Sequence, residues 1–208
     1  MTDKTAFHHG NLKAALIDHS LQILANEGVE GLTLRKAARH AGVSEAAPYR
    51  HFKDKDALLA AIATQGFLKL ATELEQVEQL YEDDARRLFR ESCLAYIRFA
   101  QSNPDSMRIM FRSRNRAGDS SYPDLQEAAD EVFNYLIDTV EFCQHADIAP
   151  DGHPLPLALS AWSTLHGLAM LLIGNCISPT VFSETNQNEL IEKILDSIIA
   201  GWQAAATG

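Results

Sequence analysis

The stretch from Thr33 to Phe52 carries the side-chain types that proteins use to bind DNA. It reads TLRKAARHAGVSEAAPYRHF, so that arginine and lysine are interspersed with histidine, tyrosine and serine. Cationic side chains pair with phosphates, and an arginine can contact O6 and N7 of guanine together. A glutamate such as Glu45 can accept a hydrogen bond from the amino group of cytosine. The residue types therefore indicate recognition of DNA.

The spacing within this stretch predicts two short helices joined by a tight turn. Thr33 is a typical N-cap for a helix over 34–40, because its hydroxyl can accept from an otherwise unpaired backbone N–H. Gly42 permits the backbone conformation in which that helix ends. Ser44 is expected to cap a second helix over 45–51, which could enter a DNA major groove.

The segment from about residue 10 to 67 resembles the DNA-binding domain of the TetR/AcrR family of bacterial transcriptional regulators. The resemblance rests on EGVEGLTL at 27–34, AGVS at 41–44 and YRHFKDKDALL at 49–59, in that order. It implies an all-α chain of about nine helices. A helix-turn-helix DNA-binding domain would occupy residues 1–60, and an effector-binding and dimerisation domain would occupy residues 61–208.

The resemblance also implies a set of DNA contacts. The residues at positions that hold phosphates are Thr33, Tyr49, His51, Lys53 and Lys55. The residues placed to read base edges are Ser44, Glu45, Ala46 and Arg50, and Arg35 is the contact expected from the preceding helix. Glu45 has a second reading, in which it stabilises the dipole of its own helix. Pro48 and Ala37 stand where the family usually has larger aliphatic residues, which leaves the tilt of the reading helix open.

The charge of the chain is divided unevenly. Residues 1–55 contain eight Lys/Arg and six Asp/Glu, a balance of +2, whereas residues 56–208 contain ten and twenty-two, a balance of −12. The two parts sum to the net charge of −10. Basic charge is therefore concentrated where the DNA-binding motif lies, and the acidic remainder would repel phosphate.

Apolar spacing predicts helices along the rest of the chain. They are expected over about 12–26, ended by Gly28, from a cap at Asp54 to about 79, from Asp83/Asp84 to Pro104, over about 105–111, over about 123–145 and over about 188–205. Arg112, Arg114 and Arg116 are expected in a loop. The polar N-terminus does not look like a signal peptide, so a cytoplasmic protein is expected.

A second informative stretch runs from His153 to Ile177 and contains no Asp, Glu, Lys or Arg from Pro154 onward. A membrane span is disfavoured, because flanking Lys/Arg are lacking and His166 interrupts the segment. A helix buried between its own core and a partner subunit fits better. Together with the helix over 188–205 it would form a four-helix bundle across a two-fold axis, as is common in the family.

Trp162, His166 and Gly167 resemble the Trp-His-Gly signature of one C-terminal domain class in the family. The residues expected to line an effector pocket are Tyr96, Phe99, Met107, Met110, Phe111, Phe133, Trp162, His166 and Met170. The same side chains could instead form an ordinary core, with His166 hydrogen-bonded inside it. No cofactor is indicated, and the spacing of His145, Asp147, Asp151 and His153 fits no metal site.

These features predict a homodimeric transcriptional regulator that binds double-stranded DNA at a palindromic operator. Release of a repressor by a small, largely apolar effector is the favoured mechanism, although an activator is not distinguished. An enzyme is not expected, because glycine-rich phosphate loops and nucleophile-elbow motifs are lacking. Two alternatives stay open. One is a thiol-based sensor that uses Cys93, Cys143 or Cys176, and the other is a protein-interaction module with vestigial DNA-binding heads.

Overall fold

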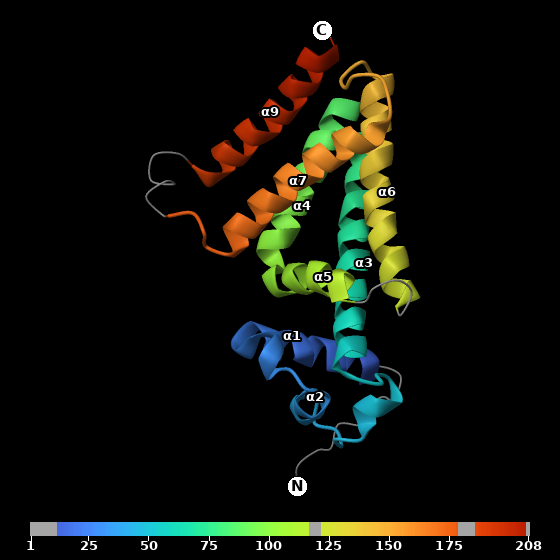
Figure 1. Cartoon of the computed structure of the whole chain (residues 1–208), viewed down its shortest axis with the longest axis vertical. Helices are drawn as coiled ribbons and strands as arrows, with labels where there is room; N and C mark the ends of the chain where they lie inside the picture. The colour runs from blue at the N-terminus through green and yellow to red at the C-terminus, as the bar shows by residue number, and fades with distance from the viewer. Residues whose placement is uncertain (1–11, 117–121, 179–185, 207–208) are drawn as a thin grey trace. The chain divides into compact units, whose positions relative to one another are not determined.

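The computed structural model describes residues 12–116, 122–178 and 186–206, and the regular structure in these ranges is entirely helical (Figure 1). The elements are α1 (Leu12–Gly31), α2 (Leu34–His40), the 3-10 helix η1 (Ala47–Arg50), α3 (Lys55–Tyr81), α4 (Ala85–Ser102), α5 (Pro104–Arg116), α6 (Pro123–His145), α7 (Pro154–Ile173) and α9 (Gln187–Ala206). The all-α prediction is confirmed.

The chain forms two compact units. The head unit comprises the chain up to Phe67 together with Asp105–Glu127, and the body unit comprises Leu68–Pro104 together with the chain from Ala128 onward. Each unit is therefore built from two separate stretches of sequence. α3 and α6 contribute residues to both units, whereas η1, α1 and α2 belong to the head alone.

The first helix of the head ends where the sequence predicts. Leu16 and Ile23 of α1 are buried, and the helical backbone breaks at Gly28, which has φ 67° and ψ −173°. The chain then enters α2, where the backbone N–H of Lys36 donates to the Thr33 hydroxyl at 3.1 Å. The predicted Thr33 cap is thus confirmed, and it fixes the start of the helix-turn-helix.

The second helix of the motif differs from its prediction. The sequence predicts an α-helix over 45–51 with a Ser44 side-chain cap, but the structure has only the 3-10 helix η1, and no side-chain cap bond forms at its N-terminus. Pro48 explains the difference, because it has no N–H to donate to the Ser44 carbonyl four residues back. The N–H of Ala47 donates to that carbonyl instead, at 2.9 Å, which is the tighter 3-10 pattern.

The fourth predicted helix and the short helix after Pro104 pack together in the head. α3 begins at an Asp54 cap, with the Ala57 N–H donating to Oδ1 at 2.8 Å. A Cβ added to Gly66 of α3 would come within 2.7 Å of the Met110 sulfur, so the absence of a side chain at Gly66 allows α5 to approach closely. The rings of Phe67 and Phe111 meet edge-on with centroids 5.6 Å apart.

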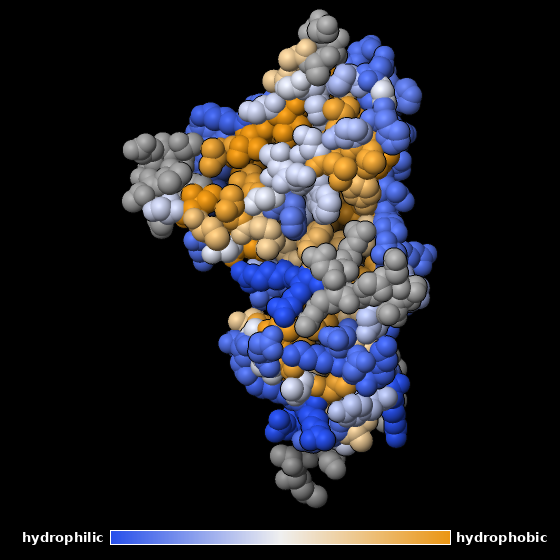
Figure 2. All heavy atoms as spheres, in the orientation of Figure 1, coloured by the Kyte–Doolittle hydropathy of each residue, from blue (hydrophilic) through white to orange (hydrophobic). Residues whose placement is uncertain are grey.

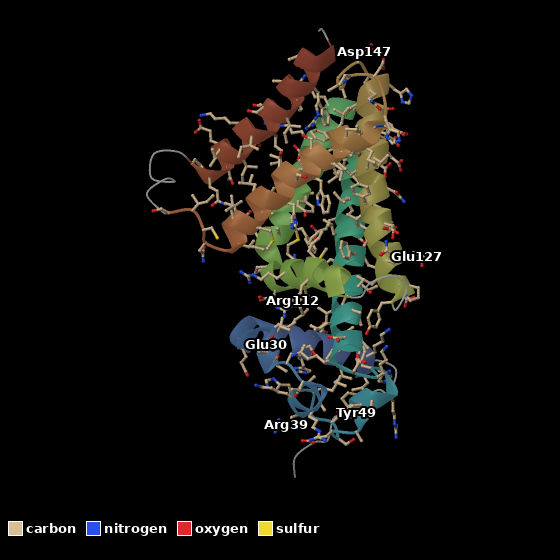
Figure 3. All side chains as sticks on the ribbon, viewed as in Figure 1. Glu30, Arg39, Tyr49, Arg112, Glu127 and Asp147 are labelled. Carbon is tan, nitrogen blue, oxygen red and sulfur yellow. The ribbon has the colours of Figure 1, made fainter. Side chains whose placement is uncertain are left out.

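The loop predicted for Arg112, Arg114 and Arg116 is wrong, because α5 continues through all three positions. The sequence contains no proline or glycine between Pro104 and Gly118 that would end the helix earlier. Arg112 lies 3.6 Å from a carboxylate oxygen of Glu30, an ion pair inside the head unit, and Figure 3 labels both residues.

In the body unit α7 packs on α4, and polar contacts join α3, α4 and α6. The Tyr135 hydroxyl of α6 donates to the Leu74 carbonyl at 3.2 Å and lies 2.9 Å from the Ser92 hydroxyl. α9 packs through Trp202, whose ring lies 4.6 Å from that of Phe89. These contacts fasten the helices of the body to one another through buried groups.

The apolar stretch from His153 to Ile177 forms the shorter helix α7, with the Leu155 N–H donating to Nδ1 of His153 at 3.2 Å. By length and composition alone, α3 and α7 are both able to cross a membrane. Of their most apolar windows, 56% is buried in α3 but only 28% in α7. Leu155, Leu159 and Leu171 are exposed, and Figure 2 shows hydrophobic residues along α7. Within the part of the chain that the structure describes, one side of α7 is therefore uncovered.

Candidate nucleic-acid interface and effector region

The turn between α2 and η1 presents most of the predicted DNA contacts at the surface of the head unit. Tyr49 is 52% exposed, a high value for an aromatic side chain, and Figure 3 shows it at the same end of the head as Arg39. The exposed members of the predicted set are Thr33, Arg35, Ser44, Glu45, Ala46, Tyr49, Arg50, His51 and Lys53. Their exposure leaves these side chains accessible to a ligand as long as DNA.

Glu45 lies between two arginines. One carboxylate oxygen is 3.8 Å from Arg35 Nε and the other is 4.0 Å from Arg39 Nε. Neither reading of Glu45 from sequence anticipated this arrangement. Exposed ion pairs of this length contribute little to stability, so the main consequence is that Glu45 lies beside the guanidinium groups of Arg35 and Arg39.

Lys55 forms a hydrogen bond within the head unit. Its ammonium donates to the Val29 carbonyl at 2.5 Å, and the side chain is half-buried. Lys36 of α2 pairs with the carboxylate of Glu27, which is close to Val29 in the sequence. Both lysines thus brace the segment around Gly28, where the backbone leaves the helical conformation. The structure gives Lys55 a structural partner in addition to the phosphate contact predicted for it.

Lys53 contacts an aromatic ring from a distant part of the sequence. Its ammonium lies 5.3 Å from the centroid of Tyr122, the residue just before α6. Burial raises the pKa of Tyr122, Asp54 raises it further, and the nearby ammonium of Lys53 acts in the opposite direction. The phenol therefore stays neutral at pH 7 and offers Lys53 an uncharged, electron-rich face.

The candidate effector region in the body unit is an aromatic cluster between α4, α6 and α7. The Tyr96 hydroxyl lies 2.9 Å from Nδ1 of His166. The ring of Trp162 is 5.8 Å from that of His166 and 5.8 Å from that of Phe133. The structure thus brings together four of the predicted lining residues, from three helices.

This cluster is uncharged at pH 7. Burial lowers the pKa of His166, so the imidazole stays neutral. Burial also raises the pKa of Tyr96, and a hydrogen bond with Trp162 opposes that shift only in part. Among the residues that the structure describes, no group of three or more His, Cys, Asp or Glu side chains that could hold a metal ion is found.

The remaining predicted lining residues are divided between the units. Phe99 of α4 is buried and Met170 of α7 is half-buried, both in the body. Met107 and Met110 are fully buried in the head, where Phe111 packs on Phe67. The nine residues therefore do not form a single cluster in one unit. Sequence spacing could not reveal this, because α5 lies between the two stretches that build the body.

Comparison with known proteins identifies the family. Residues 16–62 match the model of bacterial regulatory proteins of the tetR family, and residues 89–198, more than half of the chain, match that of the tetracyclin repressor-like C-terminal domain.

The chain belongs to the TetR family of bacterial regulatory proteins.

Solved structures extend this result. A protein of unknown function from Rhodococcus sp. RHA1 has 32% identity and a TM-score of 0.82, over 96% of this chain and 100% of that one. A tetR-family regulatory protein from Rhodococcus RHA1 has 17% identity and a TM-score of 0.71, over 91% and 96% of the two chains. The regulator FadR from Bacillus subtilis, solved in complex with stearoyl-CoA, has 14% identity and a TM-score of 0.71, over 90% and 98%. The last two share the fold of this chain.

This TetR-family chain is therefore a DNA-binding transcriptional regulator, and proteins of its family are generally not enzymes. Two of its three cysteines are poorly suited to redox sensing. Cys93 and Cys143 are buried, and burial raises the pKa of both thiols, that of Cys143 to about 12. Reaction with an oxidant requires the thiolate, which is scarce at pH 7 for such groups. Cys176 is exposed.

Sequence reasoning missed two contacts of the predicted DNA-binding residues, one from Arg39 to Glu45 and one from Tyr122 to Lys53. The pairing of Arg39 with Glu45 joins α2 to the turn that follows it and is visible only in three dimensions. No pattern in the sequence points to Tyr122. The contact between Tyr122 and Lys53 joins residues far apart in sequence, and no local pattern signals it.

Proposed function

We propose that this TetR-family regulator is a repressor that leaves a palindromic operator when a small, largely apolar effector binds the body unit. The observation that carries the DNA-binding half of this proposal is the exposed Tyr49 among exposed cationic side chains on the head. The effector half rests on the neutral aromatic cluster around His166.

On DNA, phosphates are held by Thr33, Tyr49, His51 and Lys53, and base edges are read from Ser44 to Arg50. Arg50 is the residue suited to guanine, because a guanidinium can donate to O6 and N7 together. Lys55 contributes by holding the Val29 carbonyl, and any phosphate contact it makes is secondary. Arg35 and Arg39, which lie beside Glu45, approach the backbone from α2.

The effector is expected to be apolar over most of its surface with one hydrogen-bonding group. Phe133 and Trp162 provide aromatic surface, and Tyr96 and His166 provide the polar atoms. A buried site with no charge would penalise a charged group that enters it without a partner. The structural neighbour from Bacillus subtilis was solved in complex with stearoyl-CoA, and the long apolar acyl chain of that ligand supports an effector with a large apolar part.

The functional unit is a homodimer formed through α7 and α9. The uncovered side of α7 contains leucine, glycine, serine and threonine but no charged residue, which suits close packing of helices. A two-fold dimer presents two heads to the two half-sites of a palindrome. Effector binding favours a conformation in which the heads are spaced wrongly for the operator, and α3, which belongs to both units, carries the change.

The test is fluorescence anisotropy on DNA from upstream of the protein's own gene, at two salt concentrations and against scrambled DNA. Wild-type protein should bind the upstream DNA selectively and more weakly at high salt. Tyr49→Ala should weaken binding about tenfold or more, the worth of a charge-assisted hydrogen bond. Since Tyr49 is largely exposed, the thermal unfolding temperature should not change.

The matched control is Leu80→Ala, which removes a side chain that is 72% exposed on the body part of α3. It should leave both DNA affinity and stability as in wild type. Operator affinity that survives Tyr49→Ala would refute the proposed docking face. If the wild-type protein binds neither DNA, even at low salt, the proposal that it is a repressor is refuted.

A further inference from the structure

The N-terminal end of α6 reaches the DNA-binding surface of the head. Tyr122 immediately precedes α6, and its ring lies beside the ammonium of Lys53, 5.3 Å from the centroid. Both residues belong to the head unit. Lys53 itself stands just before the Asp54 cap of α3 and is exposed, as are Tyr49 and His51 shortly before it in the sequence.

The contact restrains Lys53 and leaves donors free, because a side-chain hydrogen bond to Tyr122 uses only one of the three N–H groups of the ammonium. A ring face attracts a cation through its quadrupole, so the N–H groups of an ammonium remain able to donate to a phosphate. A free lysine loses much rotamer freedom when it settles on one phosphate. A lysine already held beside a ring has given up part of that freedom before DNA arrives, so it binds at lower entropic cost.

The acidic neighbours make this restraint more important. Asp54 and Asp56 lie close enough to act on the electrostatics of Tyr122, and they also attract the Lys53 ammonium. Pairing with either carboxylate would draw the lysine away from a phosphate. A neutral ring offers an alternative resting place that adds no negative charge next to DNA.

We propose that Tyr122 is a positioning residue for DNA binding, which holds the Lys53 ammonium ready for a backbone phosphate and so makes the start of α6 part of the DNA-binding apparatus. The proposal rests on the proposed function, since it takes Lys53 as a phosphate contact. It makes α6 a second connection between the two units, in addition to α3, because α6 passes from the head into the body at Glu127 and Ala128. Within the body, Tyr135 fastens α6 to α3 and α4.

The experiment measures the affinity of the full-length chain for a fluorescein-labelled duplex of scrambled sequence, over a series of salt concentrations. Scrambled DNA suffices because phosphate contacts do not depend on sequence. Lys53→Met should weaken binding and reduce the slope of log affinity against log salt by about 0.9 for each phosphate that the lysine neutralises in wild type. Tyr122→Leu should weaken binding about two- to fivefold at every salt concentration, the range of an exposed cation–π contact, with the slope unchanged.

Three controls separate positioning from a structural effect. Tyr122→Phe keeps a ring face and should restore most of the affinity. In the Lys53→Met background Tyr122→Leu should have no further effect, because the two residues act as a pair. Tyr81→Leu removes a similar ring, 4.6 Å from the Arg87 guanidinium in the body unit, and should leave DNA binding intact.

The outcomes are distinguishable. Tyr122→Leu that leaves affinity unchanged, increases it, or weakens binding equally with and without Lys53 overturns the proposal while the phosphate role of Lys53 stands. Wild-type slope and affinity in Lys53→Met would remove Lys53 from the interface and overturn the proposal, with the regulator intact. If the wild-type chain binds no DNA, the proposed function falls as well.

Discussion

The hydrogen bond between Tyr96 and His166 ties one titratable group of the body unit to its folded structure. Burial lowers the pKa of His166 below its ordinary value of 6.5, so the folded chain resists protonation there. The unfolded chain takes up that proton at pH 6.5 and below. Acid therefore favours the unfolded state, and the stabilisation that neutral His166 provides is present above pH 6.5 and disappears as the pH falls towards its folded pKa.

We predict that His166→Gln reduces this pH dependence. Glutamine retains a group that can hydrogen-bond to the Tyr96 hydroxyl but does not titrate. Between pH 7 and pH 5, the urea midpoint of the wild-type protein should fall further than that of the variant. Parallel midpoint curves for the two proteins would show that His166 contributes nothing to acid sensitivity.

Also at the scale of single residues, the sequence predicted the exposure of side chains more accurately than it predicted their interaction partners. Tyr49 and Arg50 are at the surface as the DNA-binding prediction requires. The bond from Lys55 to the Val29 carbonyl could not be predicted, because it spans residues 26 apart and has a backbone acceptor. A family motif records that a lysine is needed at a position but not which of its possible partners it uses.

At the scale of elements, helix ends were predictable wherever a capping residue or glycine decides them. Thr33, Asp54 and Asp84 all accept backbone hydrogen bonds at the start of their helices. The error in the reading helix has the same origin, because Pro48 removes one backbone donor and converts the expected α-helical turn into η1. Local chemistry was sufficient for these ends, whereas the packing of α5 in the head depends on contacts between distant stretches of sequence.

Gly28 offers an element-scale prediction. Its φ of 67° with ψ of −173° lies in a region that is nearly restricted to glycine, although nothing lies within 4 Å of an added Cβ. Gly28→Ala should therefore destabilise the chain by about 1–3 kcal/mol through backbone strain alone. Denaturant unfolding measures this cost. Gly201→Ala, at a helical position that is equally uncrowded, is the control and should stabilise by about 0.5–1 kcal/mol.

The whole molecule is expected to be a dimer, and α7 supplies the test. Leu159 is 40% exposed and Leu171 is 46% exposed, on the side of α7 that the described residues leave open. A buried lysine ammonium at either site would lack a partner in the interface. Leu159→Lys and Leu171→Lys should each shift the protein to monomers in sedimentation analysis at micromolar concentration. Leu80→Lys is the control. The side chain of Leu80 is also exposed, but it belongs to α3 and not to the proposed interface on α7.

A dimer that persists in both α7 variants would refute an interface on this helix. Loss of the dimer should also weaken operator binding far more than binding to scrambled DNA, because only the operator has two half-sites that two correctly spaced heads can bind together. The sequence predicted the apolar character of α7 but not which half of it is uncovered. That assignment depends on the packing of α4 against α7.

Because the head unit is built from two separate stretches of sequence, it cannot be exchanged between related regulators as one continuous segment. Its core is completed by α5, through Met110 beside Gly66 and Phe111 on Phe67, and Arg112 of α5 also pairs with Glu30 at the surface. A chimera that takes only the N-terminal segment from another regulator would join foreign surfaces at each of these places. The boundary at residue 60 remains a prediction. A graft designed to retain native packing would have to carry residues 105–127 along with the first 67, two pieces inherited as one cassette.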